Sequence, residues 1–376
     1  MTGSSGTTGY QLQEFTPDWA VSPGRLIQRE LDAGGFSQTD VASRTNLSTK
    51  HLNQVLKGHV PLSPEVGLAL ERVLGVPAEL WLRMDVSWQA HKARETAQKS
   101  FAAIGSWVHK FPSTVLRSRG IIDSSTSAST QVEKLLRFFQ VADTEAFDRV
   151  WLEPQASYKR SQKFEINPYA TALWLRLAEV EAEHSLGDTP TFNVGKLRDV
   201  APTLPMLTRE SLKKGFRHAQ NELRKAGVLL VFIPEVEGTR ICGASRWLGT
   251  GHPIIALSGR HKFHDIFWFT LLHETGHILL HPKRATYINV EKKRGVHDDE
   301  DSLETAADQF AESLLLTERD RRELAEIDTA EDLTAFAERV GLATGVVAGQ
   351  YAHLTNDWKK FGKLRVSGEI SVDLAE

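Results

Sequence analysis

The sequence has few of the features that mark secreted or membrane proteins. It contains one cysteine, Cys242, so no internal disulfide can form, which fits a reducing compartment. No apolar run is long enough to cross a bilayer, because the longest, near residues 267–272, is followed at once by His and Glu. The N-terminus, MTGSSGTTGY, lacks the basic and apolar regions of a secretory signal. These absences predict a cytoplasmic protein without membrane segments.

An excess of one charge is also missing. The 45 Lys and Arg residues nearly balance the 48 Asp and Glu residues, which gives a formal net charge of −3. The chain as a whole is therefore not attracted to nucleic acid or to a membrane, and such binding would need a local surface. A hydrophobic content of 41% supports packed cores, and 376 residues suffice for two or three domains.

The front of the chain predicts a tail and a small helical domain. Residues 1–20 are rich in Gly, Ser and Thr, which is typical of a flexible segment. Residues 21–85 read as five short helices, in which Ser37 begins the second and Ser48 the third, because serine caps exposed N–H groups. Asn46 stands between them, where the chain needs a left-handed residue. Two short helices joined by a tight turn, inside such a unit, predict a helix-turn-helix DNA-binding domain.

The candidate DNA contacts lie on the second and third of these helices. Polar side chains that face outward can bond base edges and phosphates, and they are Thr49, Lys50, Asn53 and Gln54, with Gln38 placed for a backbone contact. Residues 21–85 hold seven basic and seven acidic residues, so a small dimerisation or partner-binding module remains the alternative. One such module covers too little DNA for specificity, and we therefore expect a homodimer on a double-stranded operator.

The middle of the chain predicts helices without chemistry. The fifth helix of the front domain begins at Pro77 and is expected to bury Leu80 and Trp81. Residues 86–190 contain further helical stretches, the first at 87–108, with apolar residues at helical spacing. We interpret this region as a helical spacer or docking layer.

Residues 191–376 predict a compact α+β domain with a metal site. Three short strands, at 228–233, 241–247 and 253–258, precede the stretch FWFTLLHETGHILL. It contains the pattern H-E-x-x-H, with its polar residues at His273, Glu274 and His277. Two imidazoles four residues apart share one helix face and suit Zn²⁺, while the Glu can act as general base on metal-bound water. The alternative is a buried helix that binds no metal.

A catalytic zinc site needs a third protein ligand and one open position. Glu304 is the preferred candidate, because it begins an amphipathic helix whose small alanines permit close approach to the zinc helix. Asp308, one turn later, then suits a hydrogen bond to the far nitrogen of a ligand His. The reverse assignment, with Asp308 as ligand, remains open. His281 is assigned to the rim, and the acidic run at 298–301 to a solvated loop.

The front domain resembles a known family. The segment SQTDVASRTNLSTKHLNQVLKGHVPLSPEVGLALERVLGVPAELWLRM, with its lead-in SPGRLIQREL, is similar to the Xre-type helix-turn-helix of HigA antitoxins. It departs at Asn46, where that family more often has Gly. The resemblance implies an operator-binding regulator and raises the question of a cognate toxin.

The rear domain resembles the ImmA/IrrE family of zinc metallo-endopeptidases, through FWFTLLHETGHILLH and the later ETAADQFAESLLL. This resemblance implies zinc ligation by His273, His277 and Glu304, with Glu274 as general base. His353, in the tail GVVAGQYAHLTND, is a candidate oxyanion donor, and a packed or surface His is its alternative. The family's activity implies cleavage of a repressor or antitoxin, either a partner or the chain itself.

The predicted protein is mainly α with a small α+β domain. It has a five-helix helix-turn-helix domain, a helical middle and a zincin-like domain with a short sheet and the H-E-x-x-H helix. The predicted function is DNA-binding regulation combined with zinc-dependent proteolysis. Two alternatives are an antitoxin-type repressor whose rear domain senses a signal or binds a toxin, and a protease whose front domain docks proteins.

Overall fold

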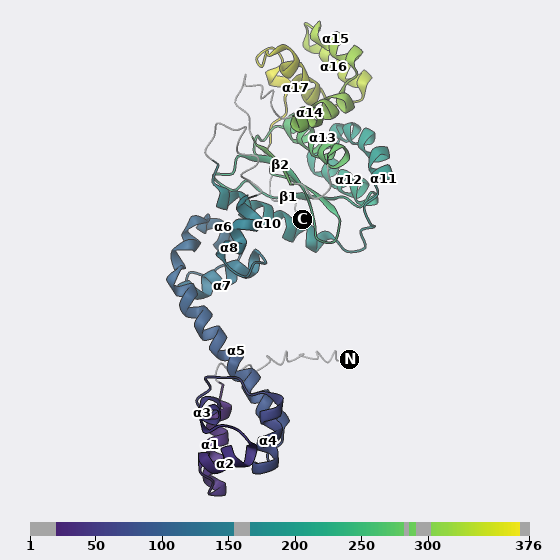
Figure 1. The fold of residues 1–376 in the computed structure, drawn as a ribbon. Helices are drawn as coiled ribbons and strands as arrows, with labels where there is room; N and C mark the ends of the chain where they lie inside the picture. Colours follow the sequence, from purple (N-terminus) through teal and green to yellow (C-terminus); the bar gives the residue numbers. More distant parts are fainter. Residues whose placement is uncertain (1–19, 154–165, 282–285, 291–301, 369–376) are drawn as a thin grey trace, which may run out of the picture. The chain divides into compact units, whose positions relative to one another are not determined.

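The computed structural model describes residues 20–153, 166–281, 286–290 and 302–368. The predicted tail up to residue 19 and the acidic run at 298–301 lie outside the described residues. The chain divides into two compact units, residues 1–105 with 127–132 and residues 106–126 with 133–376 (Figure 1). Within the described ranges, no helix combines the length and the apolar character needed to cross a membrane.

The first unit consists of helices, as predicted. They are α1 (Pro23–Gly34), α2 (Gln38–Thr45), α3 (Thr49–Leu56), α4 (Pro64–Leu74) and α5 (Ala78–Ala103). The side chain of Ser37 accepts from the backbone of Asp40, whose own side chain returns a bond to the Ser37 backbone, so α2 begins with a full capping box. Asn46 has a φ of 58°, which ends α2 in the predicted left-handed conformation.

Helix α5 differs from the prediction in two ways. It continues without a break from Ala78 to Ala103, across the predicted domain boundary at residues 85 and 86. Trp81 is fully buried, whereas Leu80 is 43% exposed, so the expectation that both enter the core was wrong for Leu80. Adjacent helical residues point about 100° apart, and Trp81 takes the inward direction.

The second unit begins with a helical layer. Its elements are η1 (Gly105–Lys110), α6 (Ser113–Ser118), α7 (Ala128–Phe138), α8 (Thr144–Phe147), η2 (Asp148–Leu152), α10 (Pro168–Ser185), α11 (Val194–Val200), η4 (Ala201–Arg209) and α12 (Leu212–Lys225). Aromatic rings hold part of this layer together by edge-to-face and stacked contacts, and they belong to Trp107, Phe111, Phe139, Phe147 and Tyr169.

A four-stranded mixed sheet follows, in the spatial order β1-β3-β2-β4. Its strands are β1 (Leu229–Phe232), β2 (Ile241–Trp247), β3 (Pro253–Leu257) and β4 (Tyr287–Val290). Strand β1 runs parallel to β3, and β2 runs antiparallel to both β3 and β4. The first three strands match the sequence prediction closely.

The remaining helices complete the second unit, and they are α13 (His264–Leu280), α14 (Ser302–Leu315), α15 (Glu318–Ala325), α16 (Ala330–Val340), α17 (Thr344–Thr355) and η5 (Gly362–Leu364). Helix α13 crosses close to α14, because a side chain at Gly276 would come within 2.9 Å of the Phe310 ring. Ala307 and Ala311, both fully buried on α14, permit the same approach. The mainly α fold with a small α+β part is therefore confirmed.

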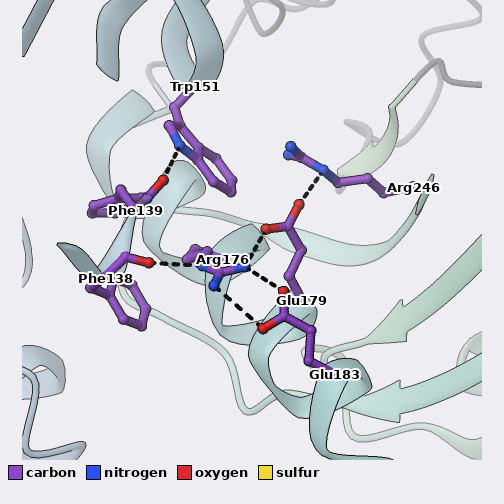
Figure 2. A network of polar contacts seen from close by, with 7 residues as sticks. All are labelled: Phe138, Phe139, Trp151, Arg176, Glu179, Glu183 and Arg246. Carbon is purple, nitrogen blue, oxygen red and sulfur yellow. Dashed lines mark hydrogen bonds and ion pairs between the residues drawn. The ribbon is translucent and has the colours of Figure 1, made fainter. Parts of the chain in front are cut away.

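A buried ion-pair network joins α7, α10 and β2 (Figure 2). Arg176 on α10 contacts Glu179 at 2.7 Å and Glu183 at 3.0 Å, and its Nε donates to the Phe138 carbonyl at 2.8 Å. The second carboxyl oxygen of Glu179 contacts Nε of Arg246, on β2, at 2.7 Å. Glu179 is thus the carboxylate shared by both arginines.

We predict that Glu179→Gln lowers the free energy of unfolding by about 3 kcal/mol, because it removes the buried carboxylate that two mostly buried guanidinium groups share. Glu183→Gln is the matched control, since the Glu183 side chain is 41% exposed and its loss should cost no more than about 1 kcal/mol. Urea unfolding followed by tryptophan fluorescence measures both. Equal losses in the two variants would contradict the central role of Glu179.

Candidate metal centre

Helix α13 presents its three motif residues on two faces. His273 and His277 lie one turn apart and face α14, where Glu304 stands in the first turn. Glu274 is adjacent to the first His and therefore points about 100° away from it. The exposed fractions are 1% for His273, 0% for Glu274 and 1% for His277, so the motif is buried.

The two imidazoles and Glu304 converge on one point. The Nε2 atoms of His273 and His277 lie 2.9 Å apart. One oxygen of Glu304 lies 3.4 Å from Nε2 of His273, and the other lies 3.3 Å from Nε2 of His277. A tetrahedral zinc ion with bonds of 2.0–2.1 Å separates its ligand atoms by about 3.3 Å. The spacing and the donor types therefore fit zinc with a position left for water.

A second carboxylate orients one of the imidazoles. Oδ1 of Asp308 lies 2.8 Å from Nδ1 of His273, on the side of the ring away from Glu304. This contact holds the ring so that Nε2 faces the cluster, as outer partners of ligand histidines usually do. Of the two assignments left open by the sequence, this geometry favours Glu304 as ligand and Asp308 as its support.

The imidazole ring of His277 is held by stacking on a tyrosine ring. Tyr287, the first residue of β4, lies parallel to the His277 ring, with centroids 4.4 Å apart and planes 10° apart. His281 completes the group, because its Nε2 lies 2.9 Å from the Leu303 carbonyl and ties the end of α13 to the start of α14. His281 thus lies beside the three clustered side chains and is not among them.

The ring of Phe269 lies between His353 and the ring of His273. His353 is exposed on α17, stacked on Phe269 with centroids 6.2 Å apart and edge-on to Trp358. Phe269 in turn contacts the ring of His273 at 6.3 Å. The structure therefore brings His353 to the neighbourhood of the site, in an aromatic row, and its oxyanion role stays a prediction.

The charges of the cluster are strongly coupled. Burial alone would raise the pKa of Glu304, but the two imidazoles hold that pKa well below its ordinary range. Burial would lower the pKa of His273, whereas the Asp308 and Glu304 carboxylates raise it to about 10. Burial raises the pKa of Glu274 to about 8 and lowers the pKa of His277.

Two of the candidate DNA contacts in the first unit are joined by a hydrogen bond. Nδ2 of Asn53 donates to Oε1 of Gln38 at 3.3 Å, and Nε2 of Gln38 donates to Gln28 on α1 at 2.9 Å. Thr49 and Lys50 are exposed at the start of α3, and the cap of Ser48 precedes them. The five predicted side chains therefore lie on α2 and α3 as expected.

Comparisons with known proteins match both halves of the chain. A helix-turn-helix family model matches residues 27–81, and the IrrE N-terminal-like domain, a peptidase M78 model, matches residues 227–349. An uncharacterized HTH-type transcriptional regulator of Escherichia coli strain K12, YddM, is 28% identical over 78 residues, which cover 21% of this chain and 83% of that protein. The chain joins a helix-turn-helix domain to an IrrE-like domain. The IrrE-like domain is metallopeptidase-like.

The sequence reasoning missed two residues of the IrrE-like domain that face the site. Tyr287 lies on β4, which the sequence analysis did not predict. Ser245 lies on β2, where the Ser245 hydroxyl lowers the pKa of Glu274. The one available signal was Gly243, because a glycine inside a strand often marks a close approach by another segment.

We predict that Glu304→Gln weakens zinc binding more than about a hundredfold, since it removes a ligand, while Asp308→Asn weakens it about tenfold by loosening His273. Competition against a chromophoric chelator measures both dissociation constants. A larger loss for Asp308→Asn would support the reverse assignment of the two carboxylates.

Proposed function

We propose that the chain is a cytoplasmic operator-binding regulator whose IrrE-like domain is a zinc-dependent endopeptidase. The observation that carries the proposal is the convergence of two imidazole Nε2 atoms and the Glu304 carboxylate at 2.9–3.4 Å. Glu274 supports it, because this carboxylate is fully buried beside the cluster and neither oxygen has a well-aligned hydrogen bond from a described residue. A buried, unused carboxylate next to a metal-ligand set suits a general base.

In this proposal, His273, His277 and Glu304 hold the zinc ion, and Asp308 keeps the His273 ring in place. Bound zinc supplies a lowered pKa for water and polarises a peptide carbonyl. Glu274 accepts the proton of the attacking water and later gives it to the leaving amine.

The proposed substrate is a protein that acts with the regulator. A repressor or antitoxin partner, or the chain itself, fits a domain that is fused to a DNA-binding unit. A cognate toxin belongs to the same proposal, through the similarity of the front domain to HigA antitoxins. The fusion would let proteolysis change the occupancy of an operator.

One observation favours a second function, in which the IrrE-like domain senses metal or binds a toxin and turns over little substrate. Glu274 is 0% exposed and His277 is 1% exposed, whereas the Glu304 side chain is 19% exposed. A centre that is shielded to this extent can bind an ion and still exclude a peptide.

We predict that Glu274→Gln reduces cleavage at least a hundredfold and leaves zinc content unchanged, since it removes the base and no ligand. The assay incubates the zinc-loaded protein with itself and with the proteins encoded beside it, and follows fragments by mass spectrometry. Glu318→Gln, an exposed change on α15, is the control. Full zinc binding by the wild type without Glu274-dependent cleavage would favour the sensor function.

The DNA-binding half of the proposal rests on α2 and α3. Lys50 offers a phosphate contact, and Asn53 and Gln54 offer amide groups that can bond base edges. The hydrogen bond between Asn53 and Gln38 fixes the orientation of both amides before DNA binds. The proposed homodimer would place two such surfaces on paired half-sites.

We predict that Lys50→Ala with Asn53→Ala lowers affinity for the protein's own promoter DNA at least tenfold, because a phosphate and a base-edge contact are lost. Lys99→Ala, an exposed change near the end of α5, removes a charge and is the control. Fluorescence anisotropy at fixed salt measures both. If the double variant bound this DNA with the affinity of the wild type, the assignment of α3 to DNA binding would be wrong.

A further inference from the structure

Strand β2 presents opposite faces to two different helices. Gly243 faces α13, because a side chain at this position would come within 2.5 Å of Thr270. Side chains alternate along a strand, so Ser245 shares that face and Arg246 points the other way. Arg246 does reach Glu179 on α10, on the far side of the sheet (Figure 2). The alternation therefore directs Ser245 toward the helix that carries the metal motif.

The neighbouring strand gives the same direction for Ser245. Its cross-strand partner on β4 is Tyr287, and directly paired residues project to the same face. The Tyr287 ring stacks on His277, so this face of the sheet meets α13 at the motif. On α13, Glu274 lies one helical turn after Thr270, the residue that Gly243 faces. On β2, Ser245 lies two residues after Gly243 and on the same face of the strand. Two matched steps thus place Ser245 opposite Glu274.

The Ser245 hydroxyl and the Glu274 carboxylate are both buried. Ser245 is 1% exposed and Glu274 is 0% exposed. Neither the Ser245 hydroxyl nor either Glu274 oxygen has a well-aligned hydrogen bond from the described residues. A buried carboxylate without a donor is costly, and a hydroxyl is a donor that can rotate toward it.

We propose that Ser245 is a positioning residue for Glu274. Its hydroxyl donates to one carboxyl oxygen and leaves the other free to take a proton from water. This role rests on the proposed function, which makes Glu274 the base. The ion pair between Arg246 and Glu179 restrains the next residue of the same strand, on its opposite face.

The test uses binding of a small probe to the zinc-loaded, full-length protein. Acetohydroxamate chelates zinc through its oxygens and carries a proton that a neighbouring carboxylate can accept. We expect Ser245→Ala to weaken acetohydroxamate binding about tenfold, as befits a hydrogen bond to a charged group, with zinc affinity unchanged. Ser245→Thr keeps the hydroxyl and should bind within about twofold of the wild type.

A double-mutant cycle separates positioning from packing. If Ser245 acts through Glu274, Ser245→Ala has no further effect on acetohydroxamate binding in a Glu274→Gln background. Equal weakening in both backgrounds, or no weakening in either, overturns the role of Ser245 and leaves the metal centre intact. A wild type that binds neither zinc nor acetohydroxamate overturns the proposed function, and the role of Ser245 with it.

Discussion

The close crossing of α13 and α14 is the constraint on which the candidate site depends. Two histidines on one helix supply only part of a coordination shell, and the missing carboxylate comes from the other helix. Gly276 and the alanines of α14 remove the bulk that would keep the axes apart. Zinc ligand atoms must lie within a small range of distances. The small residues at this crossing let the two helices come close enough for the candidate ligands to reach that range.

The sheet supports the same helix from the opposite side. Gly243 lets Thr270 approach β2, and Tyr287 on β4 lies against the ring of His277. The helix is therefore fixed between a strand pair and a second helix, with its charged groups buried in between. Charge balance makes this burial tolerable, since Glu304 and Asp308 face the imidazoles directly.

The sequence predicted the parts whose signals are local. Serine caps and Asn46 mark the helix-turn-helix, and the spacing of H-E-x-x-H places two histidines on one helix face. Glu304 was preferred as the third ligand because it begins a second amphipathic helix. The sequence could not predict Tyr287 or Ser245 as neighbours of the site, because their positions depend on the pairing of β2 with β4 across more than forty residues. Leu80 was misplaced for a related reason, since the choice between adjacent helical residues is made by packing.

In the proposed function, one face of α13 binds the metal ion and another face carries the base that activates water. The proposed ligand side chains lie toward α14 and the proposed base toward β2, so a change at Glu274 would remove turnover and spare the ion. In that function, the group that holds the ion and the group that uses it can therefore change independently of each other.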